Sequence, residues 1–287
     1  MERRHFVFNV SVGLTALQVD QLIPQELQTK KPLGVQLYTV RDAVAKDLEG
    51  SLERLRSLGY KRIEIFGYNG TFFGKTVKEF KTILRNTDLK VISSHHLSGL
   101  EPKCKGTLLD GWEKAVEDLD TIGACYMVCP FLFPEERTPK NYKALPGILE
   151  KAAKTANAAG LKFAYHNHDF EFEKFEDTLV YDHLINNTDS ELVKMEMDLY
   201  WISKAGYDPL DYFEKYPGRF PLWHVKDMEE GTKAITEVGS GTIDFDRIFA
   251  QKKKAGLEYW FVEQDSGKRD MFESLKMSRD YVNQKKY

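Results

Sequence analysis

The sequence predicts one (β/α)8 TIM barrel, an α/β fold in which eight parallel strands alternate with eight helices. From Pro32 onward, short apolar runs alternate with longer amphipathic segments, and the alternation occurs eight times. Each unit takes about 30 residues, so eight units fill the roughly 250 residues typical of this barrel. A doubly wound open sheet is the alternative, but no G-x-G-x-x-G motif follows the first apolar run.

The eight apolar runs are the predicted strands, and the segments that follow them are the predicted helices. The strands are expected at 33–38, 62–67, 90–95, 125–130, 162–167, 193–198, 220–225 and 259–264. The helices are expected at 47–59, 75–86, 111–123, 145–160, 177–187, 208–218, 244–256 and 269–284. In the first of these helices, leucines 48, 52 and 55 fall on one face, and Gly59 supplies a C-terminal stop.

The composition is that of an ordinary globular protein, and it leaves small molecules as the default partners. Of the 287 residues, 42% are hydrophobic and 30% are charged, and the formal net charge of -3 gives no reason to expect nucleic acid as a partner. No uncharged apolar run reaches the 18 or so residues of a membrane-spanning helix. The three cysteines contain no C-x-x-C pair, which argues against both a disulfide framework and a cysteine zinc site. The sequence leaves open whether the protein forms a homo-oligomer.

Residues 1–30 differ from the predicted barrel domain, residues 31–287. Arg3 and Arg4 precede a short apolar stretch that runs from about Phe6 to Leu17. This arrangement resembles a twin-arginine export signal, although no A-x-A cleavage site follows it. A used signal would make the protein periplasmic, and the alternative is an N-terminal tail on a cytoplasmic protein.

Four imidazole or carboxylate side chains stand at successive predicted strand ends. They are His166, Asp198, His224 and Glu263. Active sites of this fold lie at the carboxyl ends of the strands, where unpaired carboxylates repel one another unless a cation or protons are present. Mixed nitrogen and oxygen ligands suit Mn²⁺, Mg²⁺, Co²⁺ or Zn²⁺. The pattern therefore predicts a divalent metal site with an open position for substrate.

Three further residues at strand ends are candidates for proton transfer or charge stabilisation. Glu64 and His95 flank the other half of the predicted mouth, where a proton donor or acceptor would face the metal. Lys226 follows His224 by two residues and shares its inward side. Its ammonium could stabilise an enolate oxygen, or it could neutralise the excess carboxylate charge.

Several motifs together resemble the sugar phosphate isomerase/epimerase family of xylose isomerase-like TIM barrels, which also includes endonuclease IV. The resemblance covers about residues 33–283. It is carried by "LGVQLYTVRD", "VISSHH", "AYHNHDFEF", "MEMDLYWISKAG", "WHVKDM", "EVGSGTIDF" and "VEQD". It implies a divalent metal held by one side chain from each of strands five to eight, and it assigns Asp198, His224 and Glu263 to three ligand positions. The fifth-strand ligand of the family is usually glutamate, whereas this chain has His166, and His168 or Glu196 are the possible substitutes.

The resemblance implies proton abstraction next to a metal-polarised carbonyl of a sugar or keto-sugar. Reprotonation of the enediolate would make the protein an isomerase or epimerase, with Glu64, His95, Lys226 and Glu263 as catalytic groups. Loss of a neighbouring substituent would instead make it a lyase, dehydratase or hydrolase on an inosose or a 3-keto-glycoside. The expected substrate contacts are Tyr38, His168, Glu196 and Trp201.

Two other functions are open at this point. A catalytically silent sugar-binding barrel would fit the missing fifth-strand glutamate and an aromatic-rich rim. Phosphodiester hydrolysis is disfavoured, because the DNA-repair branch of the family carries a histidine where Trp201 stands. That branch also has two further ligands after the seventh strand that this chain does not have.

Overall fold

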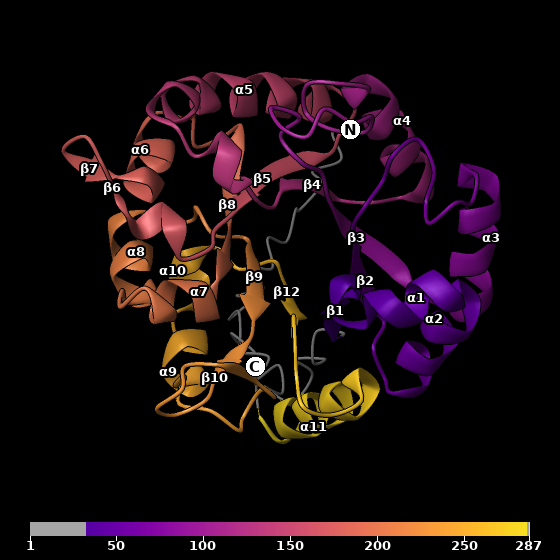
Figure 1. Cartoon of the computed structure of the whole chain (residues 1–287). Helices are drawn as coiled ribbons and strands as arrows, with labels where there is room; N and C mark the ends of the chain where they lie inside the picture. Colours follow the sequence, from indigo (N-terminus) through magenta and orange to yellow (C-terminus); the bar gives the residue numbers. More distant parts are fainter. Residues whose placement is uncertain (1–32, 286) are drawn as a thin grey trace, which may run out of the picture. The chain divides into compact units, whose positions relative to one another are not determined.

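Eight parallel strands close into a barrel, as predicted (Figure 1). The computed structural model describes residues 33–285 and 287, and these belong to one compact unit. The predicted export segment, residues 1–30, lies outside the described residues. The barrel strands are β1 (Gly34–Gln36), β2 (Arg62–Ile65), β3 (Lys90–His95), β4 (Tyr126–Cys129), β5 (Lys162–His166), β8 (Val193–Asp198), β9 (Leu222–Val225) and β12 (Tyr259–Val262).

The order of strands around the barrel is β1-β12-β9-β8-β5-β4-β3-β2, and every neighbouring pair is parallel. Helices form the outer ring in Figure 1. They are α1 (Arg41–Lys46), α2 (Leu48–Ser57), α3 (Val77–Thr87), α4 (Trp112–Ile122), α5 (Pro139–Ala158), α6 (Val180–Asn186), α7 (Leu199–Lys204), α8 (Pro209–Lys215), α9 (Phe245–Phe249), α10 (Lys252–Ala255) and α11 (Met271–Gln284). Among the described helices, none has the length and apolar character needed to span a bilayer.

Short elements complete the connections. Single 3-10 turns are η1 (Leu37–Val40), η2 (Pro134–Glu136) and η3 (Phe170–Phe172). Two small antiparallel hairpins pair β6 (Lys174–Phe175) with β7 (Thr178–Leu179), and β10 (Asp227–Met228) with β11 (Ile235–Thr236).

Helix α5 begins six residues before the predicted start at residue 145. The side chain of Thr138 accepts a hydrogen bond from the backbone N–H of Asn141, and Pro139 occupies the first helical position. Both features are typical of a helix N-terminus, and Tyr142 extends the buried face. Pro146, one residue after the predicted start, therefore lies inside the helix.

Asp227 organises the loop that follows β9. Its buried carboxylate accepts backbone N–H groups from Met228 and Ile243 on Oδ1, at 2.8 and 3.1 Å, and from Gly239 and Gly241 on Oδ2, at 2.8 and 3.0 Å. A Cβ on Gly241 would lie 2.4 Å from Asp227 Oδ1, so this close approach requires glycine. The carboxylate therefore fixes the chain immediately after Lys226.

Replacement of Asp227 by asparagine is expected to destabilise the barrel strongly. One side-chain oxygen becomes an amide donor facing two backbone donors, which leaves buried N–H groups unpaired at about 1–3 kcal/mol each. We expect a melting temperature lower by roughly 10 °C, measured by calorimetry. The same change at the exposed Asp211 of α8 is the control, and equal effects of the two changes would contradict the account.

Candidate metal centre and active site

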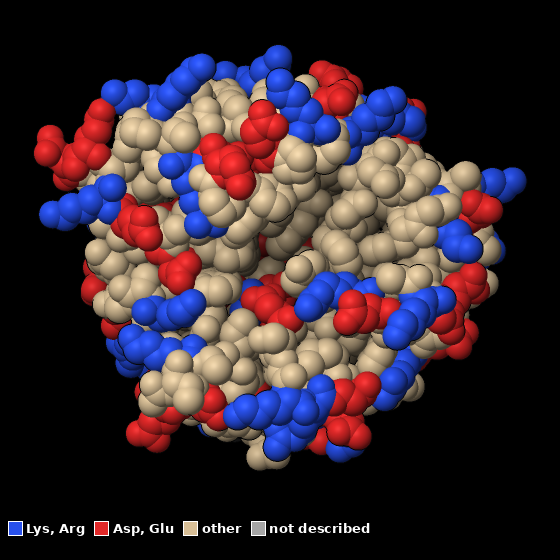
Figure 2. Space-filling model, viewed as in Figure 1, with Lys and Arg blue, Asp and Glu red and all other residues tan. Residues whose placement is uncertain are grey.

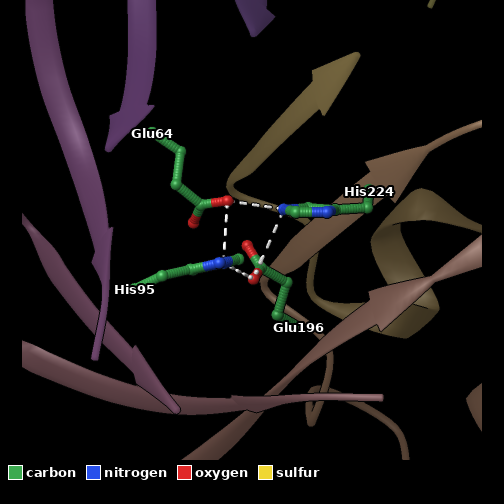
Figure 3. Close-up of side chains that lie close together, drawn as sticks. All are labelled: Glu64, His95, Glu196 and His224. Atoms are coloured by element: carbon green, nitrogen blue, oxygen red, sulfur yellow. Dashed lines mark hydrogen bonds and ion pairs between the residues drawn. The ribbon is translucent and has the colours of Figure 1, made fainter. Parts of the chain in front are cut away.

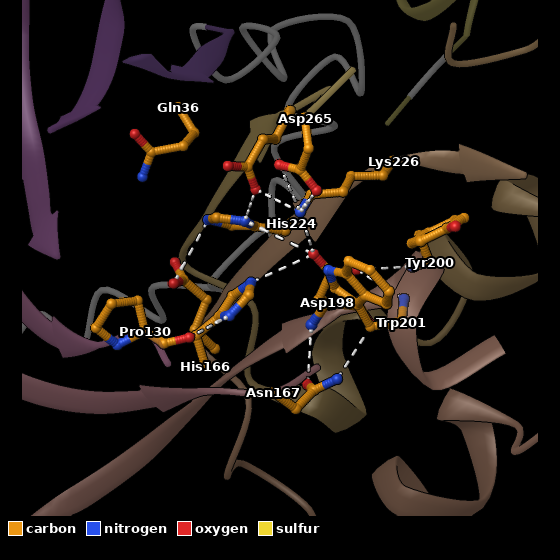
Figure 4. Close-up of polar contacts among 12 residues, drawn as sticks. Gln36, Pro130, His166, Asn167, Asp198, Tyr200, Trp201, His224, Lys226 and Asp265 are labelled. Atoms are coloured by element: carbon orange, nitrogen blue, oxygen red, sulfur yellow. Dashed lines mark hydrogen bonds and ion pairs between the residues drawn. The ribbon is translucent and has the colours of Figure 1, made fainter. Parts of the chain in front are cut away.

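Four predicted ligands come together at the carboxyl ends of neighbouring strands. β5, β8 and β9 supply His166, Asp198 and His224, which Figure 4 labels, and Glu263 directly follows β12. One nitrogen or oxygen atom from each of these four buried side chains lies within 4.8 Å of the others. The four belong to strands that are adjacent in the barrel, which explains why residues far apart in sequence meet here.

The two ring nitrogens of His166 face different partners. Its Nδ1 lies 3.1 Å from the carbonyl oxygen of Pro130, which can only accept, so Nδ1 carries the hydrogen. Its Nε2 lies 3.3 Å from Asp198 Oδ2. In the neutral imidazole both of these atoms are acceptors, so a proton or a cation must lie between them.

The local fold holds Asp198 in place. Its Oδ1 accepts the backbone N–H groups of Tyr200 and Trp201, both at 2.9 Å, and thereby caps helix α7. Asn167 Oδ1 accepts the backbone N–H of Asp198 at 3.0 Å. Oδ2 is consequently the oxygen that faces the other predicted ligands.

His224 lies between two carboxylates. Its Nδ1 is 2.5 Å from Glu263 Oε2, and its Nε2 is 2.5 Å from Glu64 Oε2 (Figure 3 shows the Glu64 side). Burial opposes the charged form, but Glu196, Glu263 and Glu64 outweigh burial and raise the pKa of His224 well above its usual value. A metal on Nδ1 would replace one proton, while Glu64 would keep Nε2 protonated and the ring oriented.

Glu64, His95, Glu196 and His224 form a second cluster with metal-ligand geometry (Figure 3). His95 Nε2 lies 3.0 Å from Oε2 of both Glu64 and Glu196. Burial lowers the pKa of His95, but these two carboxylates outweigh it and raise the pKa to about 9. His95 is therefore an imidazolium at neutral pH, and it supplies the positive charge that the two fully buried glutamates require.

Lys226 is a buried ammonium beside the first group. Its Nζ lies 3.1 Å from Asp198 Oδ2, 2.8 Å from Glu263 Oε2 and 3.1 Å from Asp265 Oδ2. Burial opposes the charge, but these three carboxylates more than compensate and raise the pKa of Lys226 well above its usual value. The ammonium thus contacts the same oxygens that would bind a metal.

The first group fits a divalent ion. Burial raises the pKa of Asp198 and of Glu263, yet Lys226 and the imidazoles outweigh burial and hold both pKa values below their usual range. The group consequently offers two ionised carboxylates and two imidazoles, a donor set suited to Mn²⁺, Zn²⁺, Co²⁺ or Mg²⁺.

A cavity of about 650 Å³ opens above this group, and Figure 2 shows it as a hollow in the centre of the face, bordered mainly by uncharged side chains. The predicted site residues that line it are Tyr38, His95, His166, His168, Trp201, Lys226 and Glu263. Four others are buried without lining it: Glu64, Glu196, Asp198 and His224.

Two of the predicted substrate contacts that line the cavity carry unsatisfied polar atoms. Within the described chain, His168 Nδ1 and Trp201 Nε1 are buried without a hydrogen-bond partner. Burial and the nearby His166 and Lys226 lower the pKa of His168 well below its usual value, so its ring is neutral. The two rings lie 5.1 Å apart on one side of the cavity.

The sequence interpretation assigned no role to several residues that shape the site. Asn167 Oδ1 holds the backbone of Asp198, and Gln36 Nε2 donates to Glu64 Oε2 at 2.7 Å. Asp265 follows Glu263 by two residues, and this spacing was the signal that could have assigned it to the site. Arg137 lines the cavity from the segment after β4, where no periodic pattern points to it.

Glu171 lies beneath the chain segment that carries His168. Its buried carboxyl accepts the Tyr165 hydroxyl and the His168 backbone N–H, both at 2.7 Å. Burial raises the pKa of Glu171 to about 8, although these hydrogen bonds oppose the shift. The folded state therefore retains a proton on this group that the unfolded chain loses near pH 4.5.

The free energy of unfolding is accordingly expected to fall as pH rises from about 4.5 to 8. Glu171 contributes at most about 1.4 kcal/mol per pH unit to this fall. Glu171→Gln removes the ionisable group and should weaken the pH dependence of the free energy of unfolding. Urea unfolding between pH 5 and pH 9 measures this dependence. Glu173→Gln, at an exposed neighbour, is the control. Parallel profiles for the wild type and Glu171→Gln would show that Glu171 does not retain the proton.

Known proteins are similar to this chain over most of its length. The sequence model of the xylose isomerase-like TIM barrel family matches residues 52–281. The chain is 24% identical over 269 residues to an inosose dehydratase from Lacticaseibacillus casei, covering 82% of this chain and 88% of that one.

Solved structures show the same fold. A sugar phosphate isomerase/epimerase from Parabacteroides distasonis superposes with a TM-score of 0.77 at 29% identity, covering 90% of this chain and 95% of that one. A xylose isomerase-like TIM barrel protein from Mycobacterium smegmatis, in complex with magnesium, has a TM-score of 0.67 at 16% identity and covers 88% of this chain and 95% of that one.

Proposed function

The chain belongs to the xylose isomerase-like TIM barrel family, and from this premise we propose that it is a divalent-metal-dependent enzyme that moves a carbon-bound proton next to a carbonyl of a sugar or keto-sugar. The observation that carries the proposal is the group of four buried side chains with ligand atoms within 4.8 Å of one another, in which His166 Nε2 faces Asp198 Oδ2 at 3.3 Å. A divalent ion held by His166, Asp198, His224 and Glu263 would supply Lewis-acid polarisation of a substrate carbonyl or hydroxyl.

The cavity residues provide the proton transfers. The Glu263 carboxylate lines the cavity and accepts the proton from carbon, and the bonding electrons move to the carbonyl oxygen. The Lys226 ammonium stabilises the negative charge on that oxygen. His95, protonated at neutral pH, lines the cavity and returns a proton, which gives isomerisation or epimerisation.

Glu64 has a positioning role in this proposal. It does not line the cavity, and its contact with His224 Nε2 directs Nδ1 of that ring towards Glu263. Glu196 is equally enclosed and pairs with His95, so it acts on the substrate through that imidazolium. The substrate contacts are then Tyr38, His168 and Trp201, with Trp201 offering its ring to the apolar face of a sugar.

A dehydratase is the second candidate, because the relative from Lacticaseibacillus casei is named an inosose dehydratase. In that reaction the enediolate expels a hydroxyl group from the neighbouring carbon, and His95 protonates the departing oxygen. A hydrolase on a 3-keto-glycoside would use the same first step, with an alcohol as the leaving group, and water would then add to the anomeric carbon of the resulting enone.

The test is proton exchange in D₂O, followed by NMR on a panel of aldoses, ketoses, inososes and 3-keto-glycosides with and without Mn²⁺. The proposal expects exchange of a proton next to the carbonyl that requires the metal. A product absorbing in the ultraviolet as an enone would identify the dehydratase. Sugar binding without any exchange would overturn the proposal in favour of a silent sugar-binding barrel.

A further inference from the structure

The mouth of the barrel has two chemically different halves. The four predicted ligands belong to β5, β8, β9 and β12, which are contiguous around the barrel. The other contiguous half consists of β1 to β4, and the segments after these strands contribute mainly apolar side chains to the cavity. They are Tyr38, Phe66, Leu97, Phe131 and Phe133.

The aromatic side chains of this half are held in a fixed arrangement. Tyr38 and Phe66 meet edge to face, with ring centroids 5.2 Å apart. Phe131 meets Phe133 edge to face at 5.4 Å, and it contacts Phe170 at 5.7 Å. The apolar half is therefore a preformed surface and needs no rearrangement to accept a ring.

The cavity is larger than a single sugar requires. At about 650 Å³ it lies in the middle of the range of about 300–1,000 Å³ that accommodates drug-sized ligands. A single pyranose of a dozen heavy atoms near the metal ligands would leave the apolar half filled with water. Replacement of that water by part of the ligand removes aromatic surface from water, which favours binding. The substrate should therefore extend over the apolar half.

Arg137 adds a second charged group to this half, besides His95 at the end of β3. Its guanidinium carbon lies 3.6 Å from the centroid of Phe170 and 5.0 Å from that of Phe131, and its Nε donates to the Leu132 carbonyl at 2.9 Å. Lys204 pairs with Asp169 at the same mouth, whereas within residues 33–285 and 287 Arg137 has no carboxylate within ion-pair distance. Its terminal nitrogens are thus free to bind an oxygen anion.

We propose that the β1–β4 half of the mouth is a binding subsite for a planar aromatic group attached to the sugar, with Arg137 recognising a phenolic or carboxylate oxygen on that group. A second sugar ring fits less well, because its several hydroxyl groups would face a mainly apolar surface whose polar side chains are Arg137, His95 and the Tyr38 hydroxyl. This inference rests on the proposed function, since it places the sugar at the metal ligands.

The test is calorimetry with the full chain and Mn²⁺, using matched phenyl and methyl glycosides of glucose, galactose, mannose and xylose, with cellobiose added. At least one phenyl glycoside should bind about tenfold or more tightly than its methyl partner. A 4-carboxyphenyl glycoside should bind more tightly still, and Arg137→Gln should remove only this last gain.

Phe133→Ala should reduce the preference for phenyl over methyl while leaving the metal content unchanged. Tyr207→Ala, at an exposed tyrosine that does not line the cavity, is the matched control. Equal binding of phenyl and methyl partners, no binding of any phenyl glycoside at millimolar concentration, or a preference for cellobiose would each overturn the inference. Metal-dependent proton exchange on free sugars would stand in all three cases, so failure of the subsite is distinguishable from failure of the proposed function.

Discussion

His224→Ala is expected to remove the bound divalent ion and to reduce kcat/KM by about a thousandfold or more. The substitution deletes a predicted ligand and also releases Glu64 and Glu263, each of which contacts one nitrogen of the ring at 2.5 Å. Metal analysis of the purified protein by mass spectrometry, together with the D₂O exchange rate, measures both effects.

This variant also loses a positive charge from among buried carboxylates, so it needs controls for folding. Loss of one partner of a buried ion pair costs about 3–5 kcal/mol, and His224→Asn is the gentler companion variant. His183→Ala changes a histidine on α6 that belongs to neither cluster and should leave the metal content unchanged. A folded His224 variant that retains its full metal content would contradict the predicted ligand set.

Lys226→Met is expected to separate turnover from metal binding. The ammonium lies 3.1 Å from Asp198 Oδ2 and 2.8 Å from Glu263 Oε2, so it competes with a cation for these oxygens. Its removal should leave metal affinity unchanged or increase it, while kcat should fall by about 10² to 10⁴ because the developing oxyanion loses its partner.

Metal affinity and kcat of the Lys226→Met variant together decide the role of Lys226. Metal titration and kcat are measured on the same preparation, with Lys204→Met as the matched control, because Lys204 lines the same cavity but pairs with Asp169. Loss of the metal together with kcat would mean that Lys226 acts as a structural counter-ion. An unchanged kcat would exclude it from the reaction.

Strand and helix patterns are local, so the barrel could be predicted from the sequence. Because a barrel places successive strand ends side by side, the proximity of the four predicted ligands could be predicted as well. The sequence could not predict how deep each side chain lies. Glu64 was expected at the mouth, but the strand register shifts between Ile63 and Glu64, and the carboxylate lies against His224 away from the cavity. Helix α7 was missed because it has six residues and follows β8 without a loop.

The sequence interpretation placed Tyr38 in the cavity wall opposite the ligands, but it missed two other residues of that wall. Arg137 and Phe133 lie in the irregular segment between β4 and α5, where neither a period of 2 nor one of 3.6 indicates which way a side chain points. Their place in the site depends on tertiary packing against Phe131 and Phe170.

The most direct test of the metal assignment is anomalous X-ray scattering from crystals of the protein grown with Mn²⁺. The account predicts one manganese peak per chain, within bonding distance of His166 Nε2, Asp198 Oδ2, His224 Nδ1 and Glu263 Oε2. A peak among Glu64, His95 and Glu196 instead, or no peak at saturating Mn²⁺, would contradict it.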